Sequence, residues 1–123
     1  FADVQGFSKF GRYIGNGNAN GVYVHLGFRP AWLMTKRADT GGAGYGWRIR
    51  DNKRDAFNPA QIRLYADTTE ADQTNDNDID WLANGFKLKE TGAGENADGG
   101  TYIYAAFAEA PFVNSNGVPC NAR

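Results

Sequence analysis

The stretch GVYVHLGFRPAWLMTKR, residues 21–37, decides the fold class that this sequence predicts. In its first part, apolar side chains occupy every second position from Val22 to Phe28. A period of two over this length is typical of a strand with one buried face. Pro30 then interrupts the pattern, because proline has no amide hydrogen to donate to a neighbouring strand. The apolar run that follows, residues 31–36, is short for a buried helix and therefore predicts a second strand.

The composition of the whole chain also favours an all-β fold. Its 123 residues are 41% hydrophobic and 22% charged, which is typical of one globular domain. Glycine occurs 16 times, more often than in an average protein, and mostly between apolar runs, where tight turns need it. We predict a two-sheet antiparallel β-sandwich of the jelly-roll kind, with helix in less than about a tenth of the chain.

Further strands are predicted where apolar residues alternate or cluster between polar or glycine-rich loops. They cover residues 7–14, 45–51, 79–82, 85–88 and 101–107. Residues 61–65 fit either a strand or part of a helix that starts near Pro59, and we favour the strand. The acidic residues 68–78 are expected to form a surface loop. The residues expected in the core are Val24, Leu26, Leu33, Ile49, Phe86, Ile103 and Phe107.

The predicted strand over residues 45–51 has an aromatic face and a basic face. Tyr45, Trp47 and Ile49 are expected to be buried, whereas Arg48 and Arg50 should face solvent. The two arginines begin a basic cluster, for which we favour salt bridges with nearby aspartates over the binding of an anionic sugar or a phosphate.

The domain organisation is expected to be simple, with one β-sandwich domain over residues 1–112 and a C-terminal tail over residues 113–123. From Phe112 onward the chain is poor in core side chains, and we predict that a neighbouring chain or domain orders it. Because the sequence begins at Phe1 rather than at a methionine, we expect a fragment or the end of a longer protein. Cys120 is the only cysteine, so no internal disulfide supports the fold.

The sequence argues against several functional classes. A formal net charge of −1 gives no basic field for nucleic acid, and no apolar run approaches the ~20 residues that a membrane span needs. His25, the only histidine, lacks the surrounding motif of a nucleophile triad. Glycoside hydrolysis needs two carboxyl groups across a cleft, and the sequence pairs none in this way. We predict no catalytic residue, no cofactor and no enzymatic activity, with a glycan-depolymerising enzyme as the weakest alternative.

One acidic string resembles a cation-binding loop. Asp76, Asp78 and Asp80 alternate with other residues, and Ca²⁺ prefers several closely spaced carboxylate oxygens. The EF-hand pattern fails, because Trp81 stands where that loop needs glycine and Lys87 where it needs glutamate. We favour a solvated acidic loop and keep Ca²⁺ binding as the alternative.

A sugar site needs exposed aromatic faces beside polar loops, because aromatic rings stack on sugars while amides and carboxylates bind the hydroxyls. We expect such a site where the loops 15–20, 39–46 and 72–80 meet at one end of the sandwich. The candidate stacking residues are Tyr45 and Trp81, and the candidate hydroxyl partners are Asn18, Asp39 and Asp78. Each aromatic residue has burial in the core as its competing explanation.

Several strings, taken in order, resemble one family. They are Tyr13-x-Gly15-Asn16-Gly17, Gly27-Phe28-x-Pro30, Trp47-x-Ile49-x-Asp51 followed by Arg54, DWLANGFKL at 80–88, and NADGGTYIYAAF at 96–107. Over residues 7–112 the chain is similar to a domain of uncharacterised function in tail-associated and other virion structural proteins of tailed bacteriophages, especially marine ones. The resemblance implies a virion protein assembled in the host cytoplasm, with a lectin-like β-sandwich and no catalytic residues.

These observations predict a non-enzymatic module of a phage tail fibre or appendage. The module is expected to form a homo-oligomer and to contact other virion subunits. Its expected function is adhesion to a host-surface glycan, and the alternative is purely structural packing or decoration between subunits. A cluster of exposed aromatics at a loop end would indicate adhesion. A broad apolar patch would instead indicate packing between chains.

Overall fold

The computed structural model describes residues 1–110, without the side chains of residues 75–77. The described chain contains eight strands, which are β1 (Ser8–Ile14), β2 (Tyr23–His25), β3 (Pro30–Arg37), β4 (Arg48–Asp51), β5 (Ala60–Tyr65), β6 (Gln73–Leu82), β7 (Gly85–Leu88) and β8 (Thr101–Ala108). No helix occurs within these residues, and hence none that is long and apolar enough to cross a membrane, so the predicted all-β class is confirmed. The predicted tail and its ordering by a neighbouring chain lie outside the described residues.

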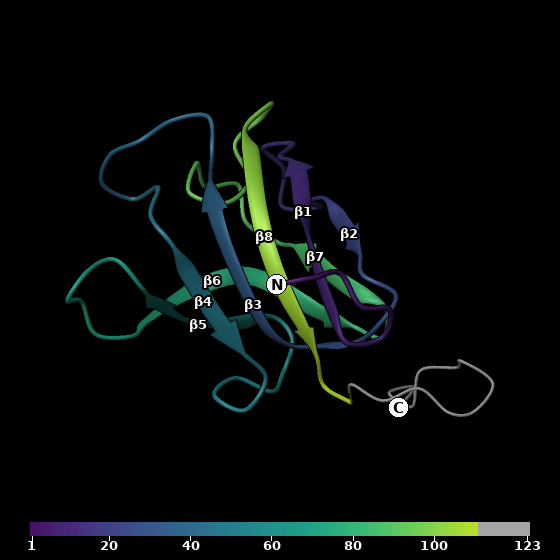
Figure 1. The fold of residues 1–123 in the computed structure, drawn as a ribbon. Helices are drawn as coiled ribbons and strands as arrows, with labels where there is room; N and C mark the ends of the chain where they lie inside the picture. Colours follow the sequence, from purple (N-terminus) through teal and green to yellow (C-terminus); the bar gives the residue numbers. More distant parts are fainter. Residues whose placement is uncertain (111–123) are drawn as a thin grey trace, which may run out of the picture.

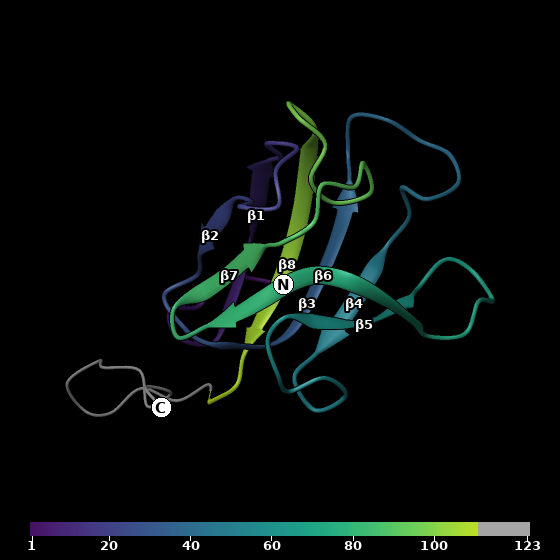
Figure 2. The same cartoon turned by 180° about the vertical axis from the view of Figure 1, so that it is seen from behind.

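The strands form one antiparallel sheet in the order β1-β8-β3-β4-β5-β6-β7-β2, which coils until it nearly closes into a barrel. In Figure 1, β6 and β7 pass behind β8 and β3, and Figure 2 shows them from the other side. The loop from β1 to β2 crosses the seam between these two edge strands. At its two ends, Gly15 N donates to Gly100 O just before β8, and Gly21 N donates to Leu88 O of β7. A side chain at Gly15 would collide with the Ala97 carbonyl, so this close approach requires glycine.

The core lies inside the coiled sheet, between the two halves of the barrel. Four predicted core residues are confirmed there, namely Val24, Leu26, Leu33 and Phe86. Further buried residues are Tyr13, Phe28, Ala60, Ile79, Trp81, Leu88, Tyr102, Tyr104 and Ala106.

Three predicted core residues instead lie on the outer side of the sheet. Ile103 is 37% exposed, and Phe107 and Ile49 are only half-buried. On β8 the alternation has the opposite phase, with Tyr102, Tyr104 and Ala106 inside. The physical reason is that a tyrosine hydroxyl can find a partner inside the barrel, as in the 2.8 Å bond from Tyr102 Oη to Ala93 O.

Strand β4 is inverted in the same way. Arg48 and Arg50 were predicted to face solvent, yet they are 6% and 1% exposed, while Tyr45, Trp47 and Ile49 are half-buried. Burial of these arginines is possible because carboxylates from other segments meet them inside the barrel.

The predicted acidic loop 68–78 is also wrong in part, because β6 begins at Gln73. At its start β5 pairs with Gln73 and Thr74, so backbone pairing there overrides the polar composition. Strand β7 pairs with the second half of β6, residues 79–82. This second half places Ile79 and Trp81 in the core. The predicted strand over residues 61–65 is confirmed as β5.

Candidate functional site

The residues that face away from the core form a continuous apolar surface on the outer side of the sheet. Side chains alternate between the two faces of a strand, so a residue that pairs in register with an outward residue also points outward. The register joins five half-buried outward residues across β1, β8, β3, β4 and β5, which are Phe10, Ala105, Met34, Ile49 and Leu64. We call this line of side chains the apolar row.

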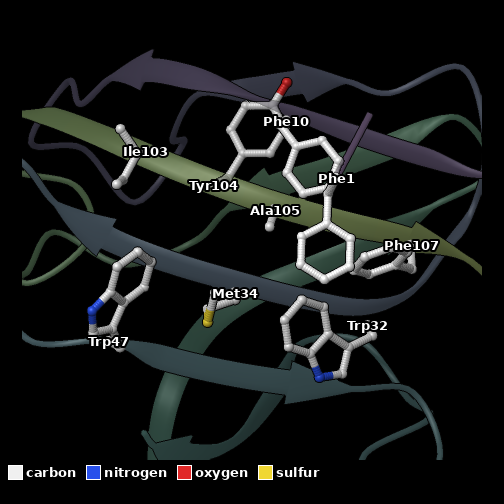
Figure 3. Close-up of a pocket in the computed structure, with 9 residues that line it drawn as sticks. All are labelled: Phe1, Phe10, Trp32, Met34, Trp47, Ile103, Tyr104, Ala105 and Phe107. Atoms are coloured by element: carbon white, nitrogen blue, oxygen red, sulfur yellow. The ribbon is translucent and has the colours of Figure 1, made fainter. Parts of the chain in front are cut away.

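The apolar row borders a hollow of about 350 Å³, shown in Figure 3. Ala105 lies in its centre, because this short side chain is flanked by the larger Phe10 and Met34 on the neighbouring strands. The lining consists of Phe1, Phe10, Trp32, Met34, Trp47, Ile103, Tyr104, Ala105 and Phe107. We call this lining together with the apolar row the outer face, leaving out Tyr104, which belongs to the core.

Aromatic contacts fix the shape of the outer face. The ring centre of Phe107 lies 5.5 Å from that of Trp32, 5.9 Å from Phe10, 6.0 Å from Phe1 and 6.2 Å from Phe7. Aromatic pairs at such distances each contribute about 0.5–1.5 kcal/mol beyond their buried area. The outer face is therefore a preformed surface held by its own side chains.

The outer face also leaves large apolar side chains in contact with solvent, such as Ile103 and the neighbouring Phe7, which is 42% exposed. A charge approaches it at Lys36, whose Nζ lies 5.7 Å from the centre of the Trp47 ring. Contiguous exposed apolar surface is a common feature of interaction sites, so the outer face is a candidate site. Sequence reasoning missed this site, because residues 31–36 are largely apolar on both faces of the strand and do not indicate which face lies outside the barrel.

A second notable cluster lies inside the barrel and consists of ion pairs. The guanidinium of Arg50 donates two hydrogen bonds to Glu95, of 2.6 and 2.5 Å, and one of 2.8 Å to Asp78. Glu95 also accepts a 2.5 Å hydrogen bond from Thr35 Oγ1. These four side chains are almost fully buried, so the ion pairs are shielded from water.

Two more arginines complete this cluster. Arg48 lies 3.3 Å from Glu95 and 3.4 Å from Glu90, and Arg63 lies 3.5 Å from Asp78. Three positive charges thus face three carboxylates, and we call these six residues the buried ion network. No local sequence pattern indicates this network, because the arginines and carboxylates that pair in it are far apart along the chain.

The carboxyl groups of the buried ion network have shifted pKa values. Burial raises the pKa of Glu90, and the nearby charge of Glu95 raises it further. Burial also opposes the ionisation of Glu95, but the charges of Arg50 and Arg48 and the hydrogen bonds from Arg50 and Thr35 together outweigh it and hold the pKa of Glu95 well below its usual range. For Asp78, burial is the largest effect and raises the pKa. Diverging pKa values also occur in acid–base catalysis, but here Glu95 has no exposed surface for a substrate to reach.

Asp78, Glu90 and Glu95 place carboxylate oxygens within 4.8 Å of one another, as the ligands of a metal ion would be. Arg48 and Arg50 already supply positive charge to these oxygens, so the arrangement is that of an ion-pair network.

The candidate cation ligands Asp76, Asp78 and Asp80 lie on strand β6 and not in a loop. Asp78 points into the barrel toward Arg50, whereas Asp80 lies 3.7 Å from Lys89 with its side chain 22% exposed. The side chain of Asp76 lies outside the described part of the chain. Asp78 and Asp80 thus have different partners, because the pairing of β5 with β6 shifts register between Ala60 and Ile62.

Two of the predicted sugar-site residues meet at the loop between β3 and β4. The Arg37 guanidinium lies 5.2 Å from the centre of the Tyr45 ring and donates a 2.6 Å hydrogen bond to Asp39 Oδ1. Asp39 Oδ2 accepts from Thr101 N, which fixes the carboxylate at the start of β8. Tyr45 is half-buried, so one part of its ring remains accessible.

The other predicted sugar-site residues are elsewhere. Trp81 is 1% exposed and its Nε1 donates to Asp55 O, so its ring is a core element and not a sugar platform. Asp78 is buried in the ion network, because residues 73–80 form a strand and not the predicted loop. Asn18 lies in the loop after β1, where its carbonyl oxygen accepts a 2.9 Å hydrogen bond from the buried Asn96.

Comparison with known proteins identifies a family. The model of a domain of unknown function, DUF7483, matches residues 1–111 of the chain. No curated protein and no solved structure matches the chain.

Proposed function

We propose that this chain, which belongs to the DUF7483 family of domains of unknown function, is a non-enzymatic structural module of a bacteriophage virion. It packs against another protein subunit through its outer face. The virion location is supported by the ordered strings over residues 7–112 that resemble phage tail and virion proteins.

The observation that carries the packing function is the apolar row, which continues in register across five strands. Interfaces are distinguished by aromatic residues and methionine at their centre and by few charges there. The outer face has this composition, with Trp32, Phe107 and Met34 around the central Ala105. Burying the outer face against a partner would stabilise the complex by about 25 cal/mol for each Å² of apolar surface that is removed from water.

The lectin-like, jelly-roll form of the fold is part of this proposal. It is supported by the way in which the coiled sheet packs across its core. Tyr13, Leu33 and Tyr102 come from the half that carries the outer face, and Phe86 and Leu88 come from the opposite half. The two halves thus cover each other as the layers of a sandwich do.

Met34→Glu tests the packing function, because it places a carboxylate in the middle of the apolar row. We expect the amount of this chain in purified phage particles to fall by about tenfold or more, since ~1.4 kcal/mol changes an association constant tenfold. Quantitative mass spectrometry of the particles measures this, and the melting temperature shows that the variant folds. Phe57→Glu is the control, because Phe57 is 84% exposed and lies outside the outer face. Particles that contain normal amounts of Met34→Glu would refute the packing function, and absence of the wild-type chain from particles would refute the virion location.

Adhesion to a host-surface glycan is the second candidate function, supported by Tyr45 and Asp39 around Arg37. A polar hollow of about 340 Å³ lies beside Tyr45. It is lined by Gly42, Ala43, Gly44 and Gly46 of this loop and by Tyr65, Asp67, Thr68, Glu70 and Gln73.

Tyr45→Ala tests adhesion. If the chain binds a glycan here, the substitution should weaken binding by about 1–3 kcal/mol, which is the usual cost of losing a well-packed contact. The melting temperature should change little, because Tyr45 is only half-buried. Binding of labelled host polysaccharide measures the effect. Unchanged glycan binding, or a large loss of stability, would remove Tyr45 from the candidate site.

A further inference from the structure

The residues on the two sides of the apolar row carry opposite charges. On one side, Arg12, Ile103 and Lys36 pair in register across β1, β8 and β3. On the other side, Phe107, Trp32 and Asp51 pair in register across β8, β3 and β4. The outer face is therefore basic on one flank and carries a carboxylate on the other.

Both cations of the basic flank are available for a partner. Within the described part of the chain, neither Arg12 nor Lys36 forms an ion pair, and the side chain of Arg12 is exposed. Asp3 lies beside Phe10 of the apolar row, where its Oδ1 accepts a 2.8 Å hydrogen bond from Phe10 N. Asp51 contacts Arg54 at 3.3 Å, with its side chain 26% exposed.

We propose that the outer face binds the same face of a second copy of this chain, around a two-fold axis that lies along the apolar row. This inference rests on the proposed packing function and names the partner. After a rotation of 180° about the row, each strand of one copy lies opposite the same strand of the other copy. The basic flank of each copy then lies over the flank of the other that carries Asp51. Lys36 of each copy then lies over Trp32 of the other, beside Asp51 on the neighbouring strand β4.

This arrangement is self-complementary, as a two-fold interface must be. The apolar rows meet along the axis and lose their contact with water. Lys36 of each copy contacts the flank of the other copy that carries Asp51, so this favourable contact occurs twice in the dimer. A rotation of 180° about an axis parallel to the strands would instead place the basic flanks of the two copies over each other. Arg12 and Lys36 of both copies would then repel one another.

Sedimentation equilibrium of the full chain tests the proposal through a double-mutant cycle. Lys36→Glu replaces two attractive contacts by two repulsive ones, and we expect the dimer dissociation constant to rise about tenfold or more. Asp51→Asn keeps an oxygen for the backbone amides of Lys53 and Arg54 but removes the charge. It should raise the dissociation constant of the wild-type chain and lower that of the Lys36→Glu chain. This change of sign is the signature of a direct contact between the copies.

Two further variants complete the design. Lys87→Glu makes the same charge change on β7, in the opposite half of the barrel, and should leave the dimer unchanged. Arg12→Glu replaces an exposed side chain and tests the same flank if Lys36→Glu does not fold.

The proposal is overturned if the wild-type chain stays monomeric at all accessible concentrations, or forms another oligomer. It is also overturned if Lys36→Glu leaves the dimer intact, or if Arg12→Glu does so in the case that Lys36→Glu does not fold. A third refuting result is that Asp51→Asn changes the dissociation constant in the same direction in the wild-type and the Lys36→Glu chains. In any of these cases, loss of Met34→Glu from particles would still support packing against a different subunit. The failure of the pairing is thus distinguishable from the failure of the proposed function.

Discussion

Arg50→Met is expected to lower the free energy of unfolding by about 3–5 kcal/mol, the usual cost of removing one partner from a buried ion pair. Methionine fills a similar space but makes none of the three hydrogen bonds that Arg50 donates to Glu95 and Asp78. Both carboxylates would then stay buried with less compensation, from Arg48 and Arg63 alone. Urea denaturation followed by tryptophan fluorescence measures the change.

Lys89→Met is the matched control for this prediction. Lys89 also faces an aspartate, at 3.7 Å, but its side chain is 36% exposed. A solvent-exposed pair of this kind contributes about 0–1 kcal/mol. If Arg50→Met costs no more than Lys89→Met, the buried ion network does not stabilise the fold.

Trp81→Ala is expected to lower the free energy of unfolding by about 3–5 kcal/mol, because it leaves a large cavity in the core. Trp81 is 1% exposed, and its indole Nε1 donates a 3.1 Å hydrogen bond to Asp55 O. Trp81→Phe keeps most of the apolar volume, so it separates the loss of this hydrogen bond, worth about 1 kcal/mol, from the loss of packing.

Trp32→Ala provides the comparison on the outer face. Trp32 is half-buried, so its removal should cost clearly less stability than that of Trp81. Chemical denaturation of the monomeric chains gives both values. A stable Trp81→Ala chain that has lost glycan binding would restore Trp81 as a sugar platform.

Local patterns predicted the strands better than the side of the sheet that each residue faces. Alternation from Val22 to Phe28 placed Val24 and Leu26 correctly, because polar or aromatic residues between them point outward. On β8 both faces are apolar, so periodicity alone could not choose between Tyr102 and Ile103 as the buried residue. The choice depends on hydroxyl partners in the loop before β8, which no local pattern reveals.

The same limit explains the inverted β4. Arginines beside a short apolar strand normally face water, and only a buried partner changes this. Glu95 lies 45 residues after Arg50 in the sequence, and it reaches the barrel interior through the loop between β7 and β8. Of the candidate sugar site, Tyr45 and Asp39 both contact Arg37, because one loop carries the two residues. The sequence could not show that Trp81 and Asp78 enter the interior from a strand.

The pairing of β1 with β8 also determines how the module responds to tension. Ser8 at the start of β1 lies opposite Phe107 near the end of β8, so the chain enters and leaves this ladder at the same end. The hydrogen bonds of an antiparallel ladder run perpendicular to the strands. A force that pulls the two chain ends apart would therefore load these hydrogen bonds one after another, and the ladder would open from the Ser8–Phe107 pair. Phe10 and Phe107 belong to these two strands and to the outer face, so a subunit bound there would act as a clamp against unzipping.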